Sequence, residues 1–220
     1  MAIGPLSRTM LQHMVLMNIL VPAAMLSLRA WQPGSFAAPV GQPSADLLSA
    51  GPGATTARAA ARSWPLATAL QLTLLWAWHA PPAFAAAMTH PWIMAAMHVT
   101  LTAAALWFWL ALVAMPDTHR WRSIIALLVT GKLFCLLGAL LAFAPRPLYA
   151  VLQSAQPALT TGSMSIALAD QQLAGIIMLT VCPLVYVFAG ITISARWFYA
   201  LERNGRADRL TPRIPTAHSA

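Results

Sequence analysis

The chain has 220 residues, of which 59% are hydrophobic and 8% are charged, and its formal net charge at pH 7 is +8. Soluble domains carry about 25% charged residues, so this composition excludes an ordinary globular protein in water and indicates a membrane protein. The positive charge is assigned to basic loops rather than to nucleic-acid binding, because no basic run is interleaved with aromatic residues.

Five apolar stretches approach the length of about 20 residues that crosses a bilayer as a helix. They are residues 9–28, 65–79 (with an upstream start near 59), 91–115, 123–144 and 171–199. Open sheets would leave backbone groups unpaired in lipid, so all five are expected to be helices. The sequence therefore predicts an all-α, polytopic membrane protein, a bundle of about five transmembrane helices.

The first stretch also has some features of a signal peptide, with Arg8 before it and small residues near its end. The polar residues Gln12, His13 and Asn18 favour a retained helix, because the central region of a signal peptide is plainly apolar. The signal peptide stays open as the alternative.

A single transmembrane domain is expected over residues 1–201. Within it, residues 33–63 are rich in Pro, Gly, Ala and Ser and are predicted to form a flexible loop. Residues 202–220 are expected to form a basic, frayed tail.

The distribution of arginine predicts the orientation, because cytoplasmic flanks of membrane helices carry an excess of Lys and Arg. One set of flanks contains Arg29, Arg58, Arg62, Arg120, Arg122, Arg203, Arg206, Arg209 and Arg213. The opposite set contains only Arg8 and Arg146. We therefore expect the N-terminus outside and the C-terminus inside.

Four potential metal ligands fall at similar depths near the outer side of four different predicted helices: His13, His79, His98 and Asp170. Methionine is concentrated there as well. At 100° per residue, one helix face carries Met10, His13, Met14 and Met17, and another carries Met94, Met97 and His98. The predicted site consists of the four ligands together with Met10, Met17 and Met94.

Imidazole and thioether together suit copper, because soft sulfur favours Cu(I) and imidazole accepts both copper states. Asp170 has two readings: it orients or binds the metal, or it only caps the fifth helix. Other readings also stay open. The histidines can hydrogen-bond between helices, His79 can anchor the chain at the membrane interface, and the methionines can serve as flexible packing.

The remaining chemistry-bearing residues suggest no enzyme. Cys135 and Cys182 stand alone in apolar surroundings and are read as small core residues. No nucleophile–base pair, phosphate-binding loop or paired carboxylates are present in the sequence.

Four segments carry a resemblance to a known family: MLQHMVLM, LLWAWHAPPAFAAAMTHPWIMAAMHVTL, LAFAPRPLY and ADQQLAGIIMLTVCPLVYVFAGITISARW. In this order they resemble the caa-type cytochrome c oxidase assembly factor (CtaG) family of bacterial membrane proteins. The family's histidines map to His13, His79 and His98, and its acidic position maps to Asp170.

The resemblance implies a factor in the bacterial inner membrane that helps to build a haem–copper oxidase, handling copper on the periplasmic side. Oxidase subunits and a periplasmic copper donor are the implied partners. Two departures are visible. Thr9 stands where the family's first motif begins with histidine, and the family usually has further spans before this motif, so we expect a shortened form.

Two other functions are compatible with the residues. His13 and His98 could ligate a haem axially, as in a membrane electron carrier. Pro22 and Pro183 could break helices, as in a copper transporter or channel.

Overall fold

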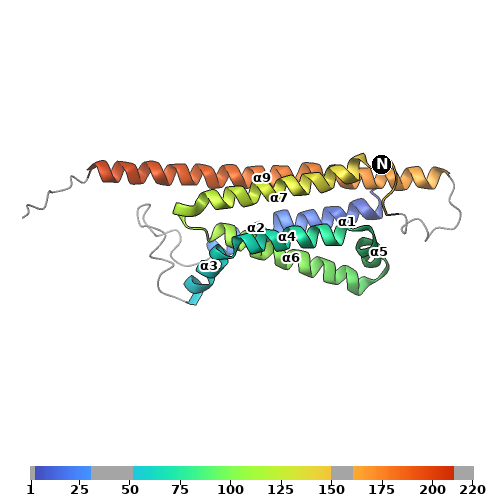
Figure 1. Cartoon of the computed structure of the whole chain (residues 1–220), viewed down its shortest axis with the longest axis horizontal. Helices are drawn as coiled ribbons and strands as arrows, with labels where there is room; N and C mark the ends of the chain where they lie inside the picture. The colour runs from blue at the N-terminus through green and yellow to red at the C-terminus, as the bar shows by residue number, and fades with distance from the viewer. Residues whose placement is uncertain (1–2, 31–51, 150–160, 211–220) are drawn as a thin grey trace, which may run out of the picture.

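The computed structural model describes residues 3–30, 52–149 and 161–210, and every regular element within these ranges is helical. The elements are α1 (Pro5–Met14), η1 (Val15–Leu20), α2 (Val21–Ala30), α3 (Pro52–Arg62), α4 (Trp64–His79), α5 (Pro81–Thr89), α6 (Pro91–Val113), η2 (Asp117–His119), α7 (Arg120–Phe143) and α9 (Thr161–Leu210). Figure 1 shows the long helices lying side by side along the longest axis of the molecule. The all-α prediction is confirmed for the described residues.

Three helices of the described residues are long and apolar enough to cross a membrane: Pro91–Val113, Asp117–Phe143 and Met164–Arg203. They match the third, fourth and fifth expected spans. The first expected span is a continuous helical run in three pieces, and the second is the 16-residue helix α4.

The first helical run contains a π-helical segment, η1, between α1 and α2. Its last turn is wide, since the backbone N–H of Val21 donates to the carbonyl of Leu16, five residues back. Pro22 follows directly, and a proline ring clashes with the carbonyl four residues before it in a regular α-helix. The wide turn lets the helix continue past Pro22.

Proline breaks neither of the two helices in which a break was considered. α2 starts at Val21 and includes Pro22, and α9 runs through Pro183 without interruption. The sequence interpretation of broken helices is therefore not supported at these positions.

Two segments that were expected to be loops contain helices. α3 occupies part of the predicted 33–63 loop, and α5 occupies the connection at 80–90 between the second and third expected spans. Alanine, which both segments contain in abundance, is the best helix former, and proline lies in the first turn of each helix, where its missing N–H costs nothing. Residues 33–51 of the predicted loop lie outside the described residues.

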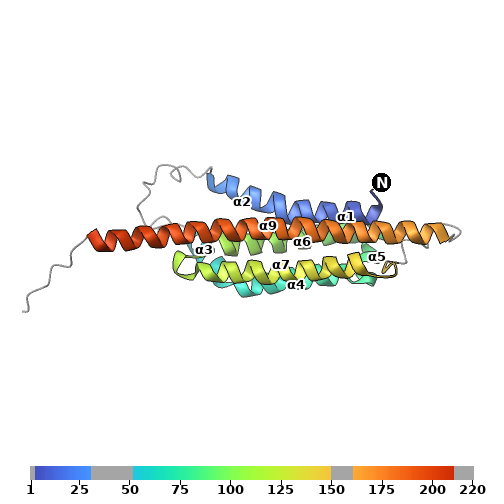
Figure 2. The same cartoon turned by 90° about the horizontal axis from the view of Figure 1, so that it is seen from above.

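The last helix is longer than expected. α9 has 50 residues and extends beyond the other helices in Figure 2, and at 1.5 Å per residue its length is about 75 Å. It continues to Leu210, so the first part of the predicted basic tail is helical. Residues 211–220 lie outside the described residues.

α7 and α9 pack closely through two glycines. A Cβ added to Gly175 would lie 2.5 Å from the backbone nitrogen of Ala142 and 2.7 Å from the carbonyl oxygen of Gly138. Small residues at such a crossing let two helix backbones approach, which is a common packing mode of membrane helices.

The centre of the bundle is aromatic. Tyr186 of α9 packs against Phe108, Trp109 and Phe134, with ring centroids 5.6–6.2 Å apart. Its hydroxyl oxygen accepts a hydrogen bond from Nε2 of Gln71 at 3.0 Å, which gives this buried amide nitrogen of α4 a partner. This core joins α4, α6, α7 and α9 and sets the positions of the polar residues described next.

Candidate functional site

The structure brings the three predicted histidines together, although they lie on three different helices. The ring of His13 (α1) lies 4.7 Å from that of His98 (α6) and 6.2 Å from that of His79 (α4), measured between centroids. His13 and His79 are buried, and His98 is half-buried. We call His13, His79, His98 and the adjacent Met10 the histidine cluster.

In His79 and His98, a hydrogen bond to a backbone carbonyl determines which ring nitrogen is free. Nδ1 of His79 lies 2.7 Å from the carbonyl oxygen of Leu75, and Nδ1 of His98 lies 2.8 Å from that of Met94. A carbonyl only accepts, so each Nδ1 carries the hydrogen and each neutral ring has its lone pair on Nε2. A backbone acceptor on the other nitrogen is the usual arrangement of a metal-binding histidine.

The free nitrogen of His79 faces a sulfur atom. Its Nε2 lies 3.1 Å from Sδ of Met10, a side chain that is fully buried. A thioether has no hydrogen to donate, so in the neutral form of His79 two lone pairs face each other. A soft cation between them would bind both atoms.

His13 has no hydrogen-bond partner for either ring nitrogen, although the residue is only 1% exposed. Leaving a buried polar group unpaired costs about 1–3 kcal/mol, and such a group in a native structure calls for an explanation. In its neutral form the His13 ring therefore has one lone pair that no donor among the described residues uses.

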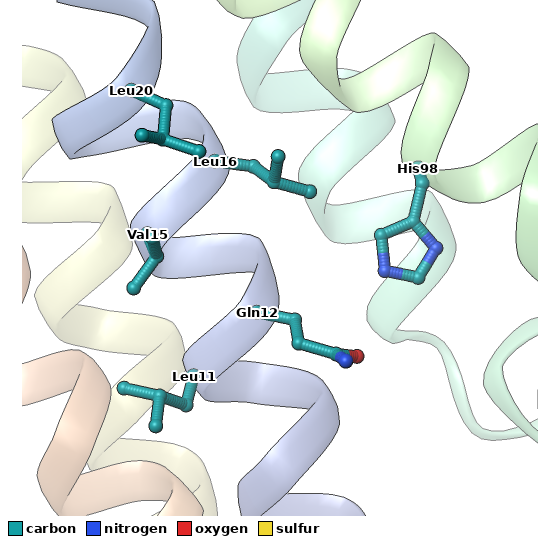
Figure 3. A pocket seen from close by; sticks show the side chains of 6 residues that line it. All are labelled: Leu11, Gln12, Val15, Leu16, Leu20 and His98. Atoms are coloured by element: carbon teal, nitrogen blue, oxygen red, sulfur yellow. The ribbon is translucent and has the colours of Figure 1, made fainter. Parts of the chain in front are cut away.

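His98 connects the cluster to a surface groove. Leu11, Gln12, Val15, Leu16 and Leu20 line this groove with His98. Figure 3 shows the His98 ring and the Gln12 side chain extending into the space between the two helices. His98 is therefore the member of the histidine cluster that borders this groove.

The cluster does not form a closed metal cage. Among the described residues, no three side chains of His, Cys, Asp or Glu are arranged so that they could hold a metal ion. The thioether of Met10 is a donor outside that set of residue types. The donors therefore fit a soft ion held by a mixture of imidazole and thioether, and they do not fit a rigid site made of histidine and carboxylate.

Two other predicted methionines have different surroundings. Met17 is buried in η1, and its backbone carbonyl accepts a hydrogen bond from Nε1 of Trp109 at 3.1 Å. Met94 is partly buried against the core, and its backbone carbonyl holds His98. The hydrogen bonds of these two residues are made by the backbone, whereas their side chains pack in or against the hydrophobic core.

Asp170 is engaged at the start of α1. Its carboxylate accepts hydrogen bonds from the backbone nitrogens of Leu6 (3.0 Å) and Ser7 (3.2 Å) and lies against the Ser7 hydroxyl. A Cβ at Gly4 would overlap this carboxylate, so glycine permits the approach. A carboxylate at a helix N-terminus satisfies unpaired N–H groups and the positive end of the helix dipole.

The location of Asp170 limits its role at the histidines. Ser7 precedes His13 by six residues, which corresponds to about 9 Å along the helix. The alternative that Asp170 caps the fifth helix is wrong, because α9 begins nine residues earlier, at Thr161, and the carboxylate instead caps α1. Its observed contacts fix the position of the helix that carries Met10 and His13.

Gln171 and Tyr149 attach the end of α7 and the residues directly after it to α9 and α4. Gln171 accepts from the backbone nitrogen of Leu148 at 2.6 Å and donates to the carbonyl of Leu141 at 3.2 Å. The Tyr149 hydroxyl donates to the carbonyl of His79 at 2.9 Å. Burial raises the pKa of Tyr149 to about 12, so this phenol stays protonated and able to donate.

One buried group of sulfur atoms was not predicted. Cys182, interpreted from the sequence as a core residue, lies with its Sγ 3.1 Å from Sδ of Met14. Nδ2 of Asn18 lies 3.4 Å from the Met14 sulfur and 3.7 Å from the Cys182 sulfur. The sequence analysis placed Met14 on the same helix face as His13. Nothing in the sequence indicates that Met14 contacts Cys182, which lies 168 positions away.

Comparison with known proteins identifies the family. The family model described as cytochrome c oxidase caa3 assembly factor matches residues 5–200, which includes every member of the histidine cluster. Neither the curated proteins nor the solved structures contain a match. The chain belongs to the cytochrome c oxidase caa3 assembly factor family.

Proposed function

We propose that the protein is a non-catalytic copper handler that binds Cu(I) at the histidine cluster and passes it to a subunit of a haem–copper oxidase. The observation that carries this proposal is the pair of facing donors, Nε2 of His79 and Sδ of Met10 at 3.1 Å, beside the unpartnered ring of His13. Copper is the ion that these donor types favour together. Membership of the assembly-factor family supports an oxidase as the recipient of the copper.

An incomplete site suits delivery of cargo. A chaperone must release its metal, and the gathered but unclosed donors imply weaker binding than a rigid cage would give. Release would occur by ligand exchange with the oxidase subunit, and uptake would occur from a periplasmic copper donor. The half-buried His98 is the cluster member at the groove and is therefore the first to exchange ligands.

A haem bound axially between His13 and His98 fits the geometry less well. Two axial imidazoles need a metal–nitrogen bond of about 2 Å on each side of the metal, plus half the width of each ring. The centroids of His13 and His98 are only 4.7 Å apart, which leaves no room for a porphyrin between them.

We further propose five membrane spans in the bacterial inner membrane, with the histidine cluster facing the periplasm. α1, η1 and α2 together form a continuous run of 26 residues from Pro5 to Ala30, about 39 Å long, and α4 adds a second, shorter span. The arginines near 29, 58, 62, 120 and 122 and beyond 202 support a cytoplasmic location for the opposite side.

The test is copper binding and oxidase assembly in the double variant His13→Ala, His98→Ala. We expect this variant to lose the copper bound at the cluster and to lower the amount of assembled oxidase. His90→Ala is the matched control, because His90 is an exposed histidine between α5 and α6. Normal copper binding and normal assembly in the double variant would exclude the proposal.

A further inference from the structure

The three residues Met14, Asn18 and Cys182 form a buried group that the proposed site does not use. Met14 and Cys182 are fully buried and Asn18 is 1% exposed. We call the two sulfur-bearing residues, Met14 and Cys182, the sulfur pair. We propose that the sulfur pair is a second Cu(I) site, which receives the ion from the histidine cluster; this inference therefore rests on the proposed function.

The distances between the donors support a shared ligand. The two sulfur atoms lie 3.1 Å apart, on helices α1 and α9, and the Cys182 sulfur also lies 3.7 Å from Nδ2 of Asn18. Thiolate and thioether are the soft ligands that select Cu(I).

Asn18 provides an independent observation. Its Oδ1 is buried and has no hydrogen-bond partner, while its Nδ2 lies against both sulfur atoms. Sulfur in a thiol or thioether is a weak acceptor, so the amide is poorly satisfied as it stands. A thiolate bound to copper carries more negative charge and would be a much better acceptor for this N–H.

The local backbone is also unusual. Asn18 lies in η1, the π-helical segment, and single π turns inside α-helices occur frequently at functional sites. The wide turn gives Met14 and Asn18 a different spacing around the helix from that of a regular α-helix. Both side chains consequently reach Cys182 on α9.

The sulfur pair lies close to the histidine cluster. Met14 follows His13 directly in the chain, and Asn18 lies four residues after Met14, about 6 Å further along the helix. Asp170 contacts Ser7 while Cys182 contacts Met14, so α1 and α9 run in the same direction. An ion that moved from His13 to Met14 would therefore move deeper into the bundle, away from the N-terminus of α1.

The charge balance favours copper at this depth. Cu(I) bound by neutral imidazole and thioether keeps a charge of +1, whereas Cu(I) bound by one thiolate has a net charge of zero. Burying an uncompensated charge is costly, so the sulfur pair suits the drier position. On binding, the S–H bond of Cys182 breaks, a sulfur–copper bond forms and one proton leaves to solvent, with no change in the oxidation state of copper.

The experiment is a Cu(I) titration of the full chain in detergent, under a reductant and without oxygen, with bound copper measured by mass spectrometry. We expect the wild-type chain to bind two Cu(I) and the Cys182→Ser chain to bind one. The wild-type chain should also release one proton, from the Cys182 thiol, that the variant does not release. Cys135→Ser is the matched control and should still bind two, because the thiol that lies against the Met14 sulfur is that of Cys182. Unchanged stoichiometry in Cys182→Ser would overturn the inference.

A second measurement keeps the test decisive if Cys182→Ser does not fold. In Cys135→Ser, Cys182 is the remaining thiol of a chain with two cysteines. Cu(I) should then produce the ultraviolet absorption of a copper–thiolate bond, and its absence would overturn the second site. The proposed function is tested separately by the His13→Ala, His98→Ala variant. If that variant keeps the full wild-type copper content, the proposed function fails whatever the result for Cys182.

Discussion

Nε2 of His79 lies 3.1 Å from Sδ of Met10, and the hydrogen bond from Nδ1 of His79 to the Leu75 carbonyl leaves this nitrogen without a proton in the neutral ring. Two donor atoms on α1 and α4 thus face each other inside the bundle. The thioether of Met10, three residues before His13, thus contacts the histidine cluster directly, and Met10 is the first residue to test.

Met10→Leu should weaken Cu(I) binding at least about tenfold, which corresponds to ~1.4 kcal/mol. Leucine is close to methionine in volume, so the fold should be retained, while the sulfur donor is removed. Competition with a chelator of known Cu(I) affinity measures the change. Met164→Leu is the control, because Met164 is exposed at 48%; equal weakening in both variants would argue against Met10 as a ligand.

Asp170→Asn separates a capping role from a metal-binding role. The amide keeps the shape of the carboxylate but loses its charge and one of its acceptor oxygens, so the start of α1 should be less stable by about 1–2 kcal/mol. Thermal unfolding in detergent measures this loss. Copper content at saturating Cu(I) should stay at the wild-type value, and a reduced content in folded protein would make Asp170 a ligand.

Asp117→Asn is the control for that charge change. Asp117 forms an exposed ion pair with Arg120 at 2.8 Å, close to the start of α7. Exposed pairs of this kind contribute about 0–1 kcal/mol, so this variant should unfold close to the wild-type temperature.

Gly175→Ala should destabilise the packing of α7 against α9 by about 1–3 kcal/mol. The added methyl group would meet backbone atoms of Gly138 and Ala142, which cannot rotate away as a side chain can. Gly190→Ala, on the same helix, has nothing within 4 Å of the added Cβ. It should be neutral or stabilising, because alanine favours a helix over glycine by about 1 kcal/mol. Similar melting temperatures for the two variants would contradict the close crossing.

Tyr149→Phe should affect the histidine cluster without touching a donor atom. It removes the hydrogen bond to the His79 carbonyl, which is worth about 1 kcal/mol, and retains the contact of the ring with Phe84. We expect a lower unfolding temperature and weaker Cu(I) binding, because α4 is less firmly held at His79. Tyr199→Phe, an exposed tyrosine of α9, is the control and should leave both quantities unchanged.

Much of the helical architecture could be predicted from the order of residues alone, because a chain with this little charge must pair its backbone internally in lipid. The third and fourth expected spans agree with α6 and α7 to within a few residues. Periodicity placed Met10 on the same face as His13, and the sequence placed one histidine on each of three helices at similar depth. Whether these histidines meet was decided by the tertiary structure, which brings the His13 ring to 4.7 Å from that of His98 and 6.2 Å from that of His79. The sequence motifs also pointed to the family that the family model confirms.

The contacts between helices were decided by the tertiary structure. The Asp170 carboxylate reaches Ser7 across 163 positions, and the Cys182 thiol reaches Met14 across 168. Helical periodicity determines which residues share a face, but it does not determine the rotation and axial shift of one helix against another. Those depend on side-chain packing, here on the close approach at Gly175 and the aromatic core around Tyr186. For the same reason a cysteine that looked isolated in the chain became the partner of a methionine in the folded protein.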